Sequence, residues 1–135
     1  MDQPTSPTQA TECLITLYHP DMPAARRFYE DRVGLEIREV TYDWYVGYWL
    51  TSARTTTLCI SSSPTERARY GAEGRGVVVD LMVADVDELY RQLVQRGVVF
   101  EHPPEDFPWG LRQAKFTDPA GYTLSISAYT AKASG

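Results

Sequence analysis

The carboxylate of Asp80 is the side chain in this sequence with the clearest capacity for chemistry. It interrupts the apolar run Val77–Val83, and strand alternation would place it on the same face as Val78 and Met82. A carboxylate inside a strand is costly unless it has a partner, so Asp80 could bind a cation or act as a general base. Alternatively, it pairs with an arginine such as Arg112 or lies in water at the mouth of a wide cavity.

Aromatic side chains gather in two segments and suggest a surface for a ligand. One cluster lies within eight residues, and a second lies in the proline-rich segment 103–111. Aromatic residues in strands often belong to a core or a dimer interface, whereas tryptophans at Trp44 and Trp109, in a hairpin tip and a loop, favour a ligand platform. The residues predicted to bind a ligand are Trp44, Tyr48, Trp49, Cys59, Asp80, Phe107, Trp109, Arg112 and Ser125.

An enzyme built from the same chain would need an acid or a base. Asp80 or Glu12 would fill that role, with Tyr18 or His102 assisting. His19 and His102 each precede a proline, and we expect both histidines to be exposed loop residues. The sequence contains no P-loop, no dinucleotide-binding glycine pattern and no serine-centred nucleophile elbow.

The secondary-structure pattern around these residues occurs twice in the sequence. An apolar run ends in an aspartate, a helical pattern follows, and a glycine closes it, first over 13–34 and again over 77–97. The aspartates Asp21 and Asp85 lie 64 residues apart, and the glycines Gly34 and Gly97 lie 63 apart. Aspartate is a good helix N-cap and glycine a good C-cap, so both halves predict a strand followed by a capped helix.

Three strand-like runs follow each predicted helix. Strands joined by turns pair antiparallel, and helices must cover one face of each sheet and leave the other face open. We therefore predict an α+β fold of two paired βαβββ modules that form a half-barrel cavity. The six runs are Leu35–Thr41, Tyr45–Leu50, Thr56–Ser61, Val98–His102, Arg112–Thr117 and Thr123–Ala128.

The repeat also sets the expected domain organisation. Residues 12–128 form a single domain, with module 1 over 12–61, a linker over 62–76 and module 2 over 77–128. The linker is rich in Ser, Gly and Arg and is expected to hold a short helix near Glu66–Tyr70. We expect a disordered N-terminus over 1–11 and a loose tail over 129–135.

Two motifs carry a resemblance to a known family. The helix containing Arg26-Arg-Phe-Tyr-Glu30, with its capping Asp21 and closing Gly34, resembles the first module of the vicinal-oxygen-chelate superfamily, which includes glyoxalases, bleomycin-resistance proteins and extradiol dioxygenases. The segment Asp118-Pro-Ala-Gly121-Tyr-Thr-Leu-Ser-Ile resembles the closing hairpin of that superfamily. The resemblance covers nearly all of residues 12–128 and implies the fold. It leaves the function open among isomerases, dioxygenases, epimerases, thiol transferases and drug-binding proteins.

The resemblance also implies where metal ligands would lie. Carried over position by position, the quartet is Leu14, Cys59, Val78 and Ser125. Leucine and valine have no donor atom, and one thiol does not suffice for a divalent ion. We therefore expect a metal-free branch of the superfamily with no cofactor, in which metal-dependent glyoxalase or dioxygenase activity is not expected.

Composition narrows the classes of partner. The net charge of −5 argues against affinity for a nucleic acid backbone and is compatible with a cationic ligand. No apolar run approaches the ~20 residues that span a bilayer, and the polar start does not resemble a secretory signal. The two cysteines, Cys13 and Cys59, indicate reduced thiols in a cytoplasmic protein rather than a disulfide framework.

These observations lead to one leading hypothesis and two alternatives. The leading one is a metal-free homodimer that sequesters a planar aromatic small molecule, an antibiotic or natural product, as drug-resistance members of the superfamily do. A positive charge on that ligand would suit the acidic chain. The first alternative is a metal-independent lyase, isomerase or cyclase acting on a natural-product intermediate. The second is a binding subunit or regulator without chemistry.

Overall fold

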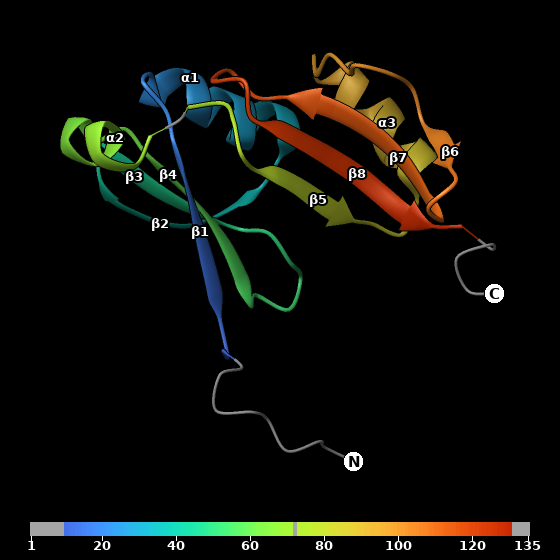
Figure 1. Cartoon of the computed structure of the whole chain (residues 1–135), viewed down its shortest axis with the longest axis horizontal. Coiled ribbons are helices and arrows are strands. Elements are labelled where there is room, and N and C mark those ends of the chain that lie inside the picture. Colours follow the sequence, from blue (N-terminus) through green and yellow to red (C-terminus); the bar gives the residue numbers. More distant parts are fainter. Residues whose placement is uncertain (1–9, 72, 131–135) are drawn as a thin grey trace.

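Each half of the chain forms its own four-stranded sheet in the computed structural model, which describes residues 10–71 and 73–130 (Figure 1). Sheet A has the strand order β1-β4-β3-β2, and sheet B has the order β5-β8-β7-β6. The strands of sheet A are β1 (Cys13–Tyr18), β2 (Glu36–Tyr42), β3 (Tyr45–Trp49) and β4 (Thr56–Ser61). Those of sheet B are β5 (Val78–Met82), β6 (Glu105–Phe107), β7 (Leu111–Thr117) and β8 (Thr123–Tyr129).

The two sheets share one topology, which confirms the predicted pair of βαβββ modules. In each sheet the first strand runs parallel to the last, and the remaining neighbours are antiparallel. The parallel pairing needs a crossover connection, and in each module the helix and the two middle strands supply it. Of the loose ends expected over 1–11 and 129–135, residues 1–9 and 131–135 lie outside the described residues, whereas Tyr129 belongs to β8.

The helices begin and end where the sequence places their caps. Helix α1 (Met22–Arg26) continues as a π-helical turn, η1 (Arg27–Val33), and the later helices are α2 (Pro64–Tyr70) and α3 (Val86–Gln95). The carboxylates of Asp21 and Asp85 accept hydrogen bonds from backbone N–H groups of the first turns, each at 3.0 Å. Gly34 closes η1 with a left-handed φ of 83°. None of the described helices has the length and apolar composition needed to cross a membrane.

One predicted strand, Val98–His102, is wrong. The strand of that region is β6, which begins only at Glu105, and Phe100 contributes an isolated bridge to Phe116. Proline has no N–H and restricts the residue before it, so Pro103 and Pro104 interrupt the ladder between the bridge and the strand. The short helix expected in the linker is present as α2.

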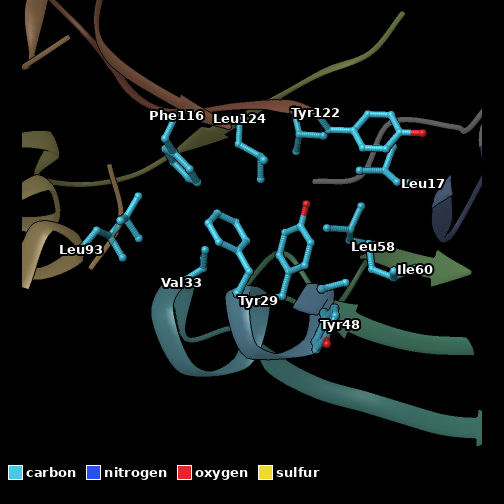
Figure 2. Close-up of a cluster of buried hydrophobic side chains, with 14 of the residues drawn as sticks. Leu17, Tyr29, Val33, Tyr48, Leu58, Ile60, Leu93, Phe116, Tyr122 and Leu124 are labelled. Carbon is cyan, nitrogen blue, oxygen red and sulfur yellow. The ribbon is translucent and has the colours of Figure 1, made fainter. Parts of the chain in front are cut away.

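The core lies between the outer faces of the two sheets, with α1 and η1 in the middle. The rings of Phe28 and Phe116 lie 6.0 Å apart, which joins the first module to the second. Figure 2 shows Tyr29 pointing from the helix toward Leu124 and Tyr122 of the second module. The alternate positions of β4 and β8 expected to face the helices are fully buried in the core cluster; they are Leu58, Ile60, Leu124 and Ile126.

A buried polar joint links the modules at the turn that contains Asp118. One carboxylate oxygen of Asp118 accepts hydrogen bonds from its own turn, from Ala120 N at 3.0 Å and Tyr122 N at 2.9 Å. The other accepts from the Tyr29 hydroxyl at 2.5 Å. His19 Nε2 lies 2.8 Å from the same oxygen, without the alignment of a hydrogen bond. His19 is 1% exposed, so the prediction of an exposed loop histidine is wrong.

Candidate functional site

The inner face of sheet B carries a connected row of polar side chains. Asp80 of β5 and Ser125 of β8 are cross-strand partners, and the Ser125 hydroxyl donates to the Asp80 carboxylate at 2.5 Å. The hydroxyls of Ser125 and Ser127 lie 2.9 Å apart. Gln113 of β7 donates from Nε2 to Ser127 Oγ at 2.9 Å and to Asp80 Oδ1 at 3.4 Å. The row forms a polar floor that crosses three strands.

An aromatic wall stands at the edge of this floor. The β6–β7 hairpin turns tightly over Pro108 to Gly110, and Gly110 adopts a φ of 89° that favours glycine. This turn stacks the rings of Phe107 and Trp109, with centroids 4.6 Å apart and planes 9° from parallel. Trp109 Nε1 donates to Gln113 Oε1 at 3.1 Å, while 60% of the residue remains exposed. The floor and the wall are therefore one hydrogen-bonded unit.

Asp80 has no Lys, Arg or His partner within ion-pair distance among residues 10–71 and 73–130. The suggested partner Arg112 lies on the other face of β7, where it binds Asp87 at 2.8 Å and Asp106 at 3.0 Å. The hydrogen bonds that Arg112 donates to these carboxylates raise the pKa of its guanidinium above its ordinary value. The alternative in which Arg112 pairs with Asp80 is therefore wrong, because alternation along β7 turns its side chain toward α3. The role of Arg112 in ligand binding stays a prediction.

The inner face of sheet A holds three more of the predicted residues. Cys59 is buried and accepts a hydrogen bond from the Tyr45 hydroxyl at 2.9 Å. Burial, with the Cys59 hydrogen bond, raises the pKa of Tyr45. The Trp49 ring lies 4.7 Å from the guanidinium of Arg38. The third residue, Trp44, occupies the tip of the β2–β3 hairpin, beside a small pocket described below.

Two further predicted residues do not face a ligand site. Tyr48 is fully buried in the core, where its hydroxyl donates to Glu30 at 2.8 Å, so its assignment to the ligand site is wrong. It pairs with Leu58 and shares that residue's outer face. Glu12 lies on the sheet A side and pairs with Arg38 at 3.2 Å. The two carboxylates considered as acid and base, Glu12 and Asp80, thus belong to different modules.

Sequence reasoning missed Gln113, the residue that joins the floor to the wall. Alternation along 111–117 offered a signal, since it sets Gln113 on the face opposite Arg112. His102, considered as an assisting residue, is half-buried and packs its ring against Phe107 at 5.7 Å. The site assembled by the structure consists of Asp80, Ser125, Ser127 and Gln113 with Phe107 and Trp109.

The positions that correspond to the superfamily's metal ligands do not offer a donor set. Leu14 and Val78 are about half exposed and carry no donor atom. Cys59 is hydrogen-bonded to Tyr45, and Ser125 is hydrogen-bonded to Asp80. In the part of the chain that the structure describes, no three His, Cys, Asp or Glu side chains come together as metal ligands would. The residues present therefore do not fit a divalent ion.

A cavity of about 770 Å³ reaches this site, since Asp80 is one of its lining residues. Its other walls come from β1, β5, α3 and the segment that follows β3, with mostly aliphatic side chains. It runs along β5, which like β1 is an edge strand with one unpaired side. Leu14, Val78 and Met82 are 47–54% exposed at these two edges. Apolar edges of this kind are typical of surfaces that another chain covers.

Comparison with known proteins identifies the family of this fold. Residues 14–126 match the family model described as the Glyoxalase/Bleomycin resistance protein/Dioxygenase superfamily. A crystal structure of a glyoxalase/bleomycin resistance protein/dioxygenase from Nocardioides has 24% identity and a TM-score of 0.76, covering 93% of this chain and 87% of that one. No curated protein matches the chain.

Two further solved structures have 26% identity. A superfamily member from Sphaerobacter thermophilus has a TM-score of 0.69, covering 89% of this chain and 98% of that one. A glyoxalase/bleomycin resistance protein from a Streptomyces species has a TM-score of 0.65, with coverage of 85% and 97%. The repeat, the caps and the matched residues agree, and the chain belongs to the Glyoxalase/Bleomycin resistance protein/Dioxygenase superfamily.

Proposed function

We propose that the chain is a metal-independent binding protein that sequesters a planar, cationic aromatic small molecule, as in resistance to an antibiotic or natural product. The observation that carries this proposal is the inner face of sheet B. There, a stacked Phe107–Trp109 pair borders a floor whose carboxylate, Asp80, has hydroxyl and amide partners but no cationic partner among the described residues.

The chemistry of this face supports the ligand class. Flat rings stack favourably on an exposed tryptophan, and the Phe107 ring backs Trp109 from the other side. A protonated amine on the ligand would be a cationic partner for the Asp80 carboxylate and would donate a charge-assisted hydrogen bond to it. Metal independence is supported by the missing donors at Leu14 and Val78. We retain a cytoplasmic location as part of the proposal, in keeping with two free cysteines.

A homodimer belongs to the same proposal. The edge strands β1 and β5 expose apolar side chains in one chain. A second copy that covered these edges would remove Leu14, Val78 and Met82 from water.

The proposal can be tested with planar aromatic probes and measurements of dye anisotropy. The cation 9-aminoacridine should bind more tightly than neutral acridone. Asp80→Asn should weaken binding of the cation about tenfold or more and leave acridone unchanged, because hydrogen bonds to charged groups contribute about 1.5–3 kcal/mol. Trp109→Leu should weaken both probes by about three- to tenfold.

Asp31→Asn is a matched control, since it removes an exposed carboxylate of η1. It should bind both probes as the wild type does. Failure of cationic planar probes to bind, or equal affinity of Asp80→Asn and wild type for them, would refute the proposed role of this face.

A further inference from the structure

A second, smaller pocket lies on the inner face of sheet A, close to α2. Its volume is about 300 Å³, and its walls are four aromatic side chains, a carboxylate and two threonines. The aromatic residues are Tyr18, Tyr42, Trp44 and Tyr45, and the carboxylate is Glu66. Among the described residues, no Lys or Arg lines it. The pocket is separate from the face of sheet B to which the proposed function refers.

The β2–β3 hairpin fixes three of the aromatic walls. Tyr42 and Tyr45 are cross-strand partners, and Trp44 occupies the turn between them. The rings of Tyr42 and Trp44 stack with centroids 4.8 Å apart and planes 3° from parallel. Tyr45 meets Trp44 edge to face at 6.1 Å. Ser62 N donates to the Trp44 carbonyl at 2.9 Å, which ties the hairpin tip to the chain that leads into α2.

The charge of the pocket comes from Glu66. Ser63 caps α2, with its hydroxyl accepting from Glu66 N, and the Glu66 carboxylate accepts a hydrogen bond from Ser61 Oγ at 3.2 Å. No Lys, Arg or His lies within ion-pair distance of Glu66 in the described part of the chain. Burial, and after it the charge of Glu66, raise the pKa of Tyr18, so this carboxylate acts on the pocket wall.

Two guanidinium groups, those of Arg38 and Arg69, lie near these aromatic side chains in the described residues. The charge of Arg38 opposes the rise in the Tyr45 pKa, and Arg38 pairs with Glu12 at 3.2 Å. The Arg69 guanidinium lies over the Tyr70 ring at 5.5 Å, and Tyr70 in turn stacks on Tyr18 at 6.2 Å. Arg69 therefore contacts the outer ring of the stack and does not line the pocket. The negative charge of Glu66 is not balanced at the pocket itself.

We propose that this pocket binds an alkylated ammonium group, such as a quaternary trimethylammonium. Aromatic faces attract cations through their quadrupoles, and a nearby carboxylate adds to that attraction. A quaternary ammonium has no N–H to donate, so the ring faces and the Glu66 charge attract it without any hydrogen bond. The group can be a whole small ligand or the cationic end of a larger one.

Choline and its uncharged isostere, 3,3-dimethylbutan-1-ol, test this proposal with the full chain. The two differ in charge and hardly in shape, so their difference in affinity measures the cation-specific part of binding. Calorimetric titration should show choline binding at least about tenfold more tightly than the alcohol, in line with cation–π attraction at a partly desolvated site. Equal affinities, or the absence of choline binding, would overturn the proposal.

Two variants locate the site. Glu66→Gln keeps an acceptor for Ser61 and removes the charge, and it should weaken choline about three- to tenfold without affecting the alcohol. Trp44→Leu should weaken choline by a similar factor. Glu101→Gln removes an exposed carboxylate outside the pocket and should bind choline as the wild type does. If Glu66→Gln and Glu101→Gln had the same effect, choline would be responding to net charge, and the assignment would fail.

The outcome is independent of the proposed function. Binding of 9-aminoacridine to the face of sheet B, measured on the same samples, should be unchanged in Glu66→Gln. Choline binding with no acridine binding would support this pocket while refuting the proposed function. Circular dichroism melting of each variant separates loss of the pocket from loss of the fold.

Discussion

Single carboxylates in this chain differ in whether they have a cationic partner. Asp87 and Glu73 each face an arginine, and those guanidinium groups lower the pKa values of both carboxyls. Asp80 and Glu66 instead accept hydrogen bonds from serine hydroxyls and have no cationic partner among the described residues. A carboxylate without such a partner retains its attraction for a ligand cation, which is why both proposals involve these two residues.

Glu30 makes the folded state sensitive to acid. Burial raises its pKa, but hydrogen bonds from Arg26 and Tyr48 outweigh burial and hold the pKa below its ordinary value of 4.5. A depressed folded pKa stabilises the fold above the unfolded value and loses that contribution as the pH falls through the folded value. Urea unfolding should therefore show stability declining below about pH 4.5. Tyr48→Phe should make the free energy of unfolding fall less steeply with decreasing pH. The same pH dependence as in the wild type would contradict this role of Glu30.

The buried Tyr29 hydroxyl should contribute more to the free energy of unfolding than an exposed tyrosine hydroxyl does. Burial, reinforced by the charge of Asp118, raises the pKa of Tyr29, so its hydroxyl remains a donor to Asp118 at all ordinary pH values. Tyr29→Phe should lower the free energy of unfolding by about 1–3 kcal/mol, because Asp118 would lose a buried donor. Chemical denaturation checks this value, with the exposed Tyr129→Phe as the control. A change equal to that of the control would contradict it.

Residue faces were predictable where alternation was applied along a whole strand. It placed Asp80 and Ser125 on one face, and the structure joins them through a hydrogen bond. Tyr48 and Arg112 were chosen for their chemical type, and alternation from Trp49 and Gln113 would have put both on the outer faces. The burial of His19 could not be predicted, because it depends on contact with Asp118, about a hundred residues away in sequence. Local sequence patterns carry no information on such a contact.

At the scale of elements, the β6–β7 hairpin controls the aromatic wall. Gly110 holds a φ of 89°, and a residue with a Cβ is strained there by about 1–2 kcal/mol. Gly110→Ala should lower stability by that amount and displace Trp109 from Phe107. Binding of 9-aminoacridine should fall together with stability. A variant that melts at a lower temperature but binds normally would show that the tip geometry is unimportant for the ligand.

The element boundaries show what a local pattern can and cannot predict. Caps at Asp21 and Asp85 are set by the chemistry of a few neighbouring residues, and both were found from the sequence. The edge strand β6 has only three residues and follows two prolines, so its position depends on pairing with β7 rather than on its own sequence. The same holds for Trp109, whose place at the hairpin tip follows from that pairing.

At the scale of the whole molecule, the exposed apolar side chains of the edge strands β1 and β5 predict a dimer. The chain has a mass of 15.2 kDa, and sedimentation equilibrium should give twice that value if a second copy covers the edges. Val78→Glu should shift the equilibrium toward the monomer, since it would place a charge in the covered edge. Glu substitution of the exposed Val99, on the loop after α3, is the control. A wild-type monomer at all concentrations would contradict the dimer.

The central claim is that the chain binds a planar aromatic cation without a metal and returns it unchanged. Equilibrium dialysis against 9-aminoacridine, with and without a metal chelator, followed by mass spectrometry of the recovered dye, tests it most directly. The affinity should be equal under both conditions, and the dye should be recovered at its original mass. Binding that disappears with chelator, or a product whose formation stops in Asp80→Asn while binding persists, would contradict it.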